Sequence, residues 1–206
     1  FIISSILFKL GMVPFHMWLI DVYEGSRTTL TLFFSTVPKL ALIFLIIKIS
    51  YLTMPLLSSY WTLLLWVTGL ASVTFASIAA IYQRRVKRLL SYSAIAHIGF
   101  IIVALSANDI LSTKASMIYI VIYTVMTLFS FGIIISSTNS RFYPKYLIDW
   151  LGILSSNPFL GLVFCISFFS IAGIPPLAGF YAKFSVLVAL VNNGFIITAL
   201  ILVIFS

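Results

Sequence analysis

Long apolar runs separated by short polar stretches make up most of this chain of 206 residues. Seven apolar segments follow one another, at about 1–14, 29–48, 60–82, 88–107, 115–137, 158–191 and 194–206. A helix that crosses the hydrocarbon core of a bilayer needs about 20 such residues. The pattern therefore predicts an all-α polytopic membrane protein with about six or seven spans, in which residues 1–206 form a single transmembrane domain.

The two ends of the chain have the pattern of incomplete spans. The first residues, FIISSILFKLGMVPF, resemble the second half of a crossing, and the last segment, 194–206, is shorter than a crossing requires. We therefore expect the domain to be truncated at both ends and to be part of a larger subunit.

The sixth segment, 158–191, is too long for one straight crossing and contains the sequence AGIPPLAG. Proline in a helix interior removes a backbone donor and clashes with the preceding turn, so we expect a discontinuous helix that is broken at Gly173, Pro175 and Pro176. Such a break survives in lipid only where the freed carbonyls face protein or water.

The first segment repeats part of this pattern. Gly11 precedes Pro14 by three residues, as Gly173 precedes Pro176. The two motifs are five spans apart, so spans that alternate in direction would give them opposite orientations. Inverted repeats with interrupted helices are typical of transporters that hold a site at the membrane midplane.

Composition supports the membrane assignment and excludes other classes of protein. Hydrophobic residues make up 62% of the chain and charged residues 8%, which is too few polar groups to cover a water-soluble globule. The single cysteine, Cys165, cannot form a disulfide framework, and we expect it to pack as a small hydrophobe. A metal site is not expected.

The net charge of +8 would suit a nucleic-acid-binding protein, but here the basic residues fall mostly between the apolar segments. Alternating spans would place these residues on one side: Arg27, Arg84, Arg85, Lys87, Arg88, Arg141 and Lys145. Only Lys48 and Lys114 lie in the opposite loops. We expect the basic side to face the cytoplasm or the mitochondrial matrix, with an amphipathic helix over 141–154 on that surface, lipid around the spans and no nucleic-acid partner.

Four titratable side chains remain inside apolar segments: Lys9, Lys39, His97 and Lys183. A lysine at the bilayer centre costs about 2.5 to 3.5 kcal/mol, so we expect these groups to face a paired or hydrated interior. Lys39 lies eleven residues beyond Thr28, about 16 Å along the helix and near the midplane. His97 is either a satisfied core histidine or part of a functional site, and the sequence leaves both readings open.

Hydroxyl groups accompany these residues. One helical face before Lys39 carries Thr28, Thr31 and Ser35, and one face of the segment 115–137 carries Tyr119, Tyr123, Thr127 and Ser130. Such hydroxyls either bond carbonyls of their own helix or hold a chain of water. Because a buried lysine exchanges its proton more readily than an exposed one, we interpret the four titratable residues as a candidate proton relay.

Four motifs in one order identify a family: KLGMVPFHMWLIDVYEG, FFSTVPKLA, KRLLSYSAIAHIGF and AGIPPLAGFYAKF. Together they resemble subunit 2 of respiratory NADH:ubiquinone oxidoreductase, complex I, from its seventh membrane helix into its C-terminal part. The resemblance implies an antiporter-like fold of two inverted repeats, each with a broken helix. It also implies proton translocation driven by NADH:ubiquinone electron transfer.

The resemblance assigns roles to the buried residues. It implies that Lys9 pairs with a glutamate two helices earlier, that Lys39 relays protons toward the centre and that Lys183 exchanges them with the far side, with His97 between Lys39 and Lys183. The glutamate has no counterpart here, because the acids Asp21, Glu24, Asp109 and Asp149 fall in loops or at span ends. A separate chain or an unseen segment would therefore carry the N-terminal helices.

The chain has no glycine-rich phosphate loop after a strand and too few cysteines for an iron–sulfur cluster. The resemblance places NADH, flavin, iron–sulfur clusters and ubiquinone in partner subunits, with other membrane-arm subunits of complex I as neighbours. The Phe- and Ile-rich composition favours the mitochondrial inner membrane, with a bacterial plasma membrane as the alternative. Two other functions remain open: a subunit of a multi-subunit cation/proton antiporter, and a structural spacer.

Overall fold

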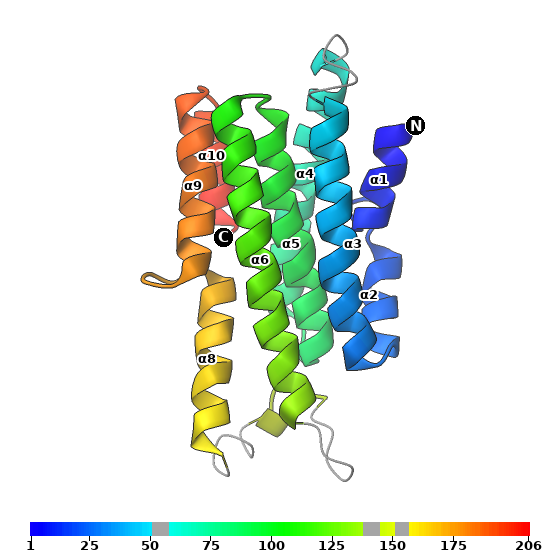
Figure 1. The fold of residues 1–206 in the computed structure, drawn as a ribbon, viewed down its shortest axis with the longest axis vertical. Coiled ribbons are helices and arrows are strands. Elements are labelled where there is room, and N and C mark those ends of the chain that lie inside the picture. The colour runs from blue at the N-terminus through cyan, green and yellow to red at the C-terminus, as the bar shows by residue number, and fades with distance from the viewer. Residues whose placement is uncertain (51–57, 138–144, 151–156) are drawn as a thin grey trace.

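The chain is a bundle of helices that run roughly along one axis (Figure 1). The structure, a computed structural model, describes residues 1–50, 58–137, 145–150 and 157–206. The helices in these ranges are α1 (Ile2–Leu10), α2 (Met17–Gly25), α3 (Thr28–Lys48), α4 (Ser58–Ile81), α5 (Val86–Ser106), α6 (Ile110–Ser137), α8 (Pro158–Ala172), α9 (Ala178–Asn192) and α10 (Ile196–Ile204). The predicted all-α class is confirmed.

Within the described residues, α3, α4, α5 and α6 are each long and apolar enough to cross a membrane. Their bounds follow the predicted segments closely, because an uninterrupted apolar run is what a crossing requires. The helices α8 and α9 are shorter and flank the residues 173–177, so the segment 158–191 consists of two helices.

The helix α2 was not predicted. Asp21 and Glu24 interrupt its apolar pattern, which predicts a span that ends at residue 14 and is followed by a loop. Instead α1 ends with Gly11 in the left-handed conformation at φ 74°, and α2 begins at Met17. The first segment therefore contributes one helix, α1, and with α2 beyond its predicted end it forms a second pair of helices around a break.

The central helix is α5. In its apolar stretch 78% of the residues are buried inside the chain, whereas the corresponding fraction is at most 56% in the other crossing helices. It packs most closely on α4, where Gly99 and Gly69 face each other: a Cβ on Gly99 would lie 3.0 Å from the Gly69 carbonyl oxygen. Small residues let two membrane helices approach in this way. The packing fixes the position of α5, which carries His97.

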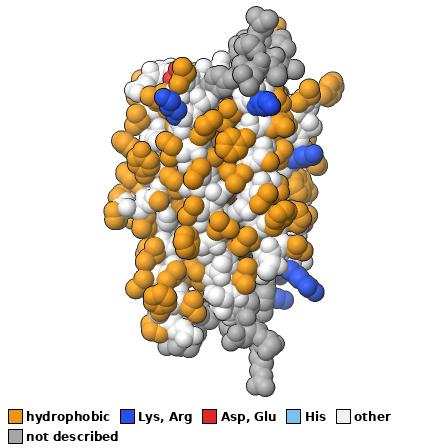
Figure 2. All heavy atoms as spheres, in the orientation of Figure 1, with side chains coloured by type: hydrophobic (Ala, Val, Ile, Leu, Met, Phe, Trp, Pro, Cys, Tyr) orange, Lys and Arg blue, Asp and Glu red, His pale blue; other side chains and the backbone are white. Residues whose placement is uncertain are grey.

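Hydrophobic side chains cover the outside of the bundle between its ends, as Figure 2 shows for one face. Phe33, Leu63, Phe129 and Ile197 are among the exposed ones. This apolar belt is the surface expected of a protein solvated by lipid. Cys165 is exposed on α8, so its predicted packing inside the chain is wrong.

An acid–base cluster ties the helices together at one end. The Glu24 carboxylate of α2 forms ion pairs with Arg85 and Arg88 at the start of α5. The backbone pairs Arg85 with Tyr146 in an isolated antiparallel bridge. Arg141 and most of the predicted amphipathic helix 141–154 lie outside the described residues.

Candidate functional site

Lys39 lies in the interior of the bundle and is only 2% exposed. Its Nζ donates to the Tyr123 Oη of α6 at 3.3 Å, and it stands 5.5 Å and 5.6 Å from the ring centroids of Tyr23 and Tyr123. Within the described residues, no carboxylate forms an ion pair with it. The ammonium group is therefore held by a hydroxyl and by aromatic faces, which attract a cation without neutralising it.

The predicted hydroxyl face of α3 does point inward. Thr31 and Ser35 are fully buried, but Thr31 Oγ1 donates to the Thr28 carbonyl at 2.7 Å and Ser35 Oγ donates to the Leu32 carbonyl at 2.9 Å. These hydroxyls thus bond their own helix. The contact with another helix is made by the Ser35 carbonyl, which accepts from Tyr123 Oη at 3.4 Å.

His97 on α5 is buried next to this pair. Its Nδ1 lies 2.9 Å from Tyr119 Oη, and its ring centroid is 5.7 Å from that of Tyr123. His97 is thus a core histidine with a hydrogen-bond partner, which is one of the two interpretations that the sequence left open. It also adjoins Tyr123, which contacts Lys39. The geometry places Tyr123 between the two titratable groups.

The four hydroxyl residues on the inner face of α6 divide into two kinds. Thr127 Oγ1 donates to the Tyr123 carbonyl at 3.0 Å and Ser130 Oγ donates to the Thr127 carbonyl at 3.0 Å, both within their own helix. Tyr119 and Tyr123 reach other helices instead. Of these four residues, the two tyrosines are therefore the ones whose hydroxyls contact a titratable side chain on another helix.

Lys183 lies on α9, beside the second break, and is 8% exposed. Its Nζ donates to the carbonyl of Ala172, the last residue of α8, at 2.8 Å. The end of a helix carries a partial negative charge that favours a cation. Gly173, at φ 85°, permits the approach, because a Cβ there would lie only 3.0 Å from Lys183 Cδ.

Phe100 stands between Lys183 and the tyrosines. The Lys183 Nζ lies 5.7 Å from its ring centroid, and the same ring stacks on Tyr119 at a centroid distance of 6.0 Å. The buried groups therefore follow one another as Lys39, Tyr123, His97, Tyr119, Phe100 and Lys183. On the side of Lys39, the hydroxyls of Tyr123 and Tyr119 contact Lys39 and His97 respectively, whereas on the side of Lys183 an apolar ring intervenes.

Two residues of this cluster were missed from the sequence. Tyr23 lies on α2, which was not predicted as a helix. Phe100 is three residues after His97 and so shares its helical face, a spacing that could have identified it.

Lys9 is not part of the cluster. It is exposed in the last turn of α1, and within the described residues no ion pair joins it to a carboxylate. The expectation that Lys9 faces a paired interior is therefore not met by this chain alone.

The turn between α8 and α9 contains Pro175 and Pro176, joined by a cis peptide bond. The bond between Val13 and Pro14 is also cis. In the part of the chain that the structure describes, no group of three His, Cys, Asp or Glu side chains could hold a metal ion. What the buried cluster offers chemically is two ammonium groups, an imidazole and three phenols, those of Tyr23, Tyr119 and Tyr123.

Comparison with known proteins gives consistent results. The family described as "NADH:quinone oxidoreductase/Mrp antiporter, TM" matches residues 1–206. NADH-quinone oxidoreductase subunit N of Coxiella burnetii is 39% identical over 100% of this chain and 43% of its own length. Subunit N 2 of Rhizobium meliloti is 42% identical over 100% of this chain and 43% of its own. The chain thus spans about two fifths of the length of these relatives.

Two solved structures have the same fold. The Mrp complex from Dietzia sp. DQ12-45-1b matches 99% of this chain and 38% of that one, with a TM-score of 0.88 and 24% identity. Respiratory complex I from Thermus thermophilus with bound aureothin matches 98% of this chain and 44% of that one, with a TM-score of 0.81 and 29% identity. With the family match over its full length, this chain belongs to the NADH:quinone oxidoreductase/Mrp antiporter membrane family.

Proposed function

We propose that the chain is part of a proton-translocating membrane-arm subunit of an NADH:quinone oxidoreductase. The observation that carries the proposal is Lys39, which is buried at mid-span and contacts a hydroxyl and aromatic rings instead of a carboxylate among the described residues. A buried ammonium group without a counter-ion releases its proton more readily than one in water. Such a lysine suits a site that loads and unloads protons.

The proton path in this proposal runs from Lys39 to Lys183 through His97. Tyr123 accepts from Lys39, and Tyr119 shares a hydrogen bond with His97. A phenol hydroxyl both donates and accepts, so each tyrosine can hold a proton in transit. Because Tyr123 Oη donates to the Ser35 carbonyl, passing a proton on to His97 requires this hydroxyl to turn or a water to bridge the two rings. Transfer past Phe100 requires its ring to move or water to enter beside it, which makes this step the natural control point.

Lys9 extends the proposal to a second polypeptide segment. An exposed lysine inside the hydrocarbon region is costly unless a partner covers it. We propose that Lys9 meets a glutamate on the N-terminal helices of a complex I subunit 2 or subunit N, of which this chain is the later part. Those helices are either a separate chain or an earlier part of the same one.

Electron transfer belongs to partner subunits in this proposal. NADH, flavin, iron–sulfur clusters and ubiquinone would all act there, and this chain would respond through electrostatics or conformation. For the membrane, composition suggested the mitochondrial inner membrane, whereas the relatives named above are bacterial and support the plasma membrane alternative.

A subunit of an Mrp-type cation/proton antiporter is the second candidate. Its support is the Dietzia structure, but at 24% identity that likeness concerns the fold alone. The curated relatives at 39% and 42% identity are named as NADH-quinone oxidoreductase subunits and favour the first candidate. A sodium gradient that drives transport without NADH would favour the second. A structural spacer gains nothing from buried lysines that cost about 2.5 to 3.5 kcal/mol each.

The test compares Lys39→Ala with Lys48→Ala in the assembled complex. Lys48 lies at the exposed end of the same helix and is the matched control. Proton translocation and NADH:quinone activity are measured together in closed vesicles. We expect the protons translocated per NADH to fall in Lys39→Ala and to stay unchanged in Lys48→Ala, whereas normal pumping by Lys39→Ala would refute the proposal.

A further inference from the structure

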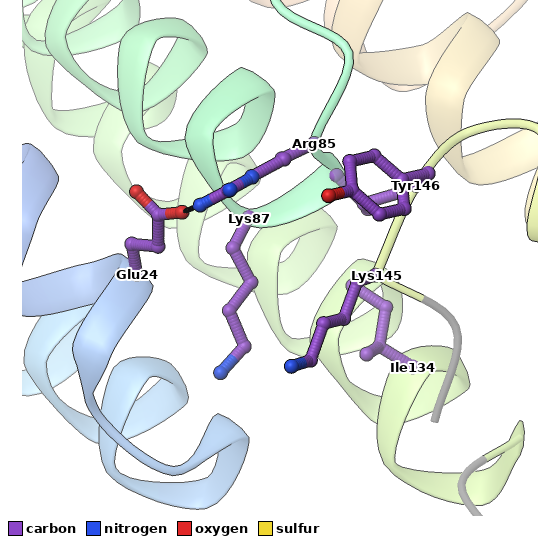
Figure 3. A pocket seen from close by; sticks show the side chains of 7 residues that line it. Glu24, Arg85, Lys87, Ile134, Lys145 and Tyr146 are labelled. Carbon is purple, nitrogen blue, oxygen red and sulfur yellow. Dashed lines mark hydrogen bonds and ion pairs between the residues drawn. The ribbon is translucent and has the colours of Figure 1, made fainter. Parts of the chain in front are cut away.

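A cavity of about 270 Å³ lies at the end of the bundle where α5 begins (Figure 3). Its lining combines charged and apolar residues, namely Glu24, Arg85, Lys87, Lys145, Ile134 and Tyr146. Lys39, His97 and Lys183 do not line it, so it is separate from the proposed proton path.

The acid in this cavity is already neutralised. The Glu24 carboxylate is shared by the guanidinium groups of Arg85 and Arg88. Arg85 is also held from the other side, since its guanidinium carbon lies 5.8 Å from the centroid of the Tyr146 ring. Two guanidinium groups around one carboxylate leave an excess positive charge on this wall.

Two lysines also line the cavity. Figure 3 shows the side chains of Lys87 and Lys145 pointing into the same space. The Lys87 Nζ donates to the carbonyl of Ser26 at 2.7 Å. The Asp149 carboxylate accepts the backbone N–H groups of Lys145 at 3.0 Å and Tyr146 at 2.9 Å. Together with Glu24 it gives two carboxylates near the cavity, which the basic side chains of Arg85, Arg88, Lys87 and Lys145 outnumber.

The backbone holds Lys145 in place. The Val86 N–H donates to the Lys145 carbonyl at 3.1 Å, and the Leu147 N–H donates to the Arg84 carbonyl at 3.0 Å. These bonds fix the segment that carries Lys145 against the start of α5, whose positive dipole end adds to the field in the cavity. Backbone hydrogen bonds therefore hold the residues that carry these positive charges next to one another.

We propose that this cavity binds the phosphate of an anionic phospholipid headgroup. The cavity lies where a membrane-crossing helix begins, which is the depth of the headgroups. Val86 and Ile134 supply an apolar wall suited to the glycerol and the first acyl carbons, which a free phosphate lacks. Basic pockets between membrane helices on the cytoplasmic side are suited to anionic headgroups. The inference goes beyond proton transfer and does not depend on it.

The test uses the assembled complex in phosphatidylcholine vesicles that contain a small share of diazirine-bearing phosphatidylglycerol. After illumination, we expect crosslinks on the peptides that contain Ile134 and Tyr146. A lysine near the surface contributes about five-fold to the local occupancy of an anionic lipid, so Lys145→Gln should lower the crosslink yield about five-fold. Adding Lys87→Gln should lower it further, and Lys114→Gln, exposed at the start of α6, should leave it unchanged.

Four results would overturn the proposal. Equal crosslinking by a diazirine-bearing phosphatidylcholine would show that the cavity does not recognise the charge of the headgroup. An unchanged crosslink yield in Lys145→Gln would show that Lys145 does not contribute to binding. Competition by excess inorganic phosphate as effective as that by unlabelled phosphatidylglycerol would assign the site to a free anion. A carbodiimide crosslink from Lys145 to a carboxylate of another subunit would assign it to a protein partner.

Discussion

The two broken helices of this chain share a local structure and differ in the side chain that bridges the break. In each, the first half ends at a glycine with positive φ, Gly11 at 74° and Gly173 at 85°. In each, the second half donates a hydrogen bond back to a carbonyl near the end of the first. At the first break the donor is the Trp18 indole, to Phe8 at 3.0 Å, and at the second it is the Lys183 ammonium, to Ala172 at 2.8 Å.

The two bridging donors, Trp18 and Lys183, differ in whether they can lose a proton. An indole N–H does not titrate, so the bridge from Trp18 is a permanent one. A charged donor makes a hydrogen bond roughly twice as strong as a neutral one, so the bridge from Lys183 weakens when the lysine loses its proton. One backbone design thus gives a fixed joint in α1–α2 and a joint that depends on protonation in α8–α9.

The largest expected effect is on the packing of the second break. A Cβ on Gly179 of α9 would collide with the backbone carbonyl oxygen of Ser170 on α8, which cannot move aside as a side chain can. We expect Gly179→Ala to cost more than the about 1 to 3 kcal/mol typical of overpacking and to abolish assembly of the complex. Native gel electrophoresis of the membrane measures this loss.

The control for this substitution is Gly132→Ala on α6, where a Cβ would meet no atom within 4 Å. It should assemble normally. Normal assembly of Gly179→Ala as well would show that α8 and α9 are not held at this distance.

An intermediate effect is expected from alanine at the two break glycines. Each substitution puts a residue with a Cβ in the left-handed conformation, which costs about 1 to 2 kcal/mol of stability. At Gly173 the new Cβ presses on Lys183, whereas at Gly11 it meets the side chain of Leu19. We expect both variants to be less heat-stable, and only Gly173→Ala to translocate fewer protons per NADH.

Heat inactivation and vesicle pumping, measured on the same preparations, separate the two outcomes. An equal loss of pumping in Gly11→Ala would show that the two breaks do not differ in their link to proton translocation.

The smallest effect is expected from Trp18→Phe. The substitution removes the hydrogen bond to the Phe8 carbonyl and keeps an aromatic ring next to Phe8, on which Trp18 stacks at a centroid distance of 5.9 Å. We expect a loss of about 1 kcal/mol of stability and unchanged protons per NADH. A thermal-shift assay with a pumping assay checks both, and a pumping defect would mean that the first bridge is not merely structural.

The sequence pattern predicted those features of the molecule that are determined by residues close together in one helix. The inward face of α3, with Thr31, Ser35 and Lys39, follows from steps of four residues in an apolar run. The break at Gly173 follows from the backbone restrictions of proline.

The remainder depends on pairings across the chain. Glu24 made α2 look like a loop, because its partners Arg85 and Arg88 are 61 and 64 residues away. The contact of Lys39 with Tyr123 joins residues 84 apart. Pairings at such distances leave no periodic trace in a single sequence.

The most direct test of the account is the number of protons translocated per NADH by the complex with Lys183→Met. Methionine fills a similar volume and removes the charge together with the hydrogen bonds to the carbonyls of Ala172 and Ser206. Lys114→Met, at an exposed lysine of α6, is the control. We expect fewer protons per NADH in Lys183→Met, with assembly retained, and an unchanged ratio in Lys114→Met. A ratio equal to that of the unmodified complex would contradict the proposal that Lys183 carries protons.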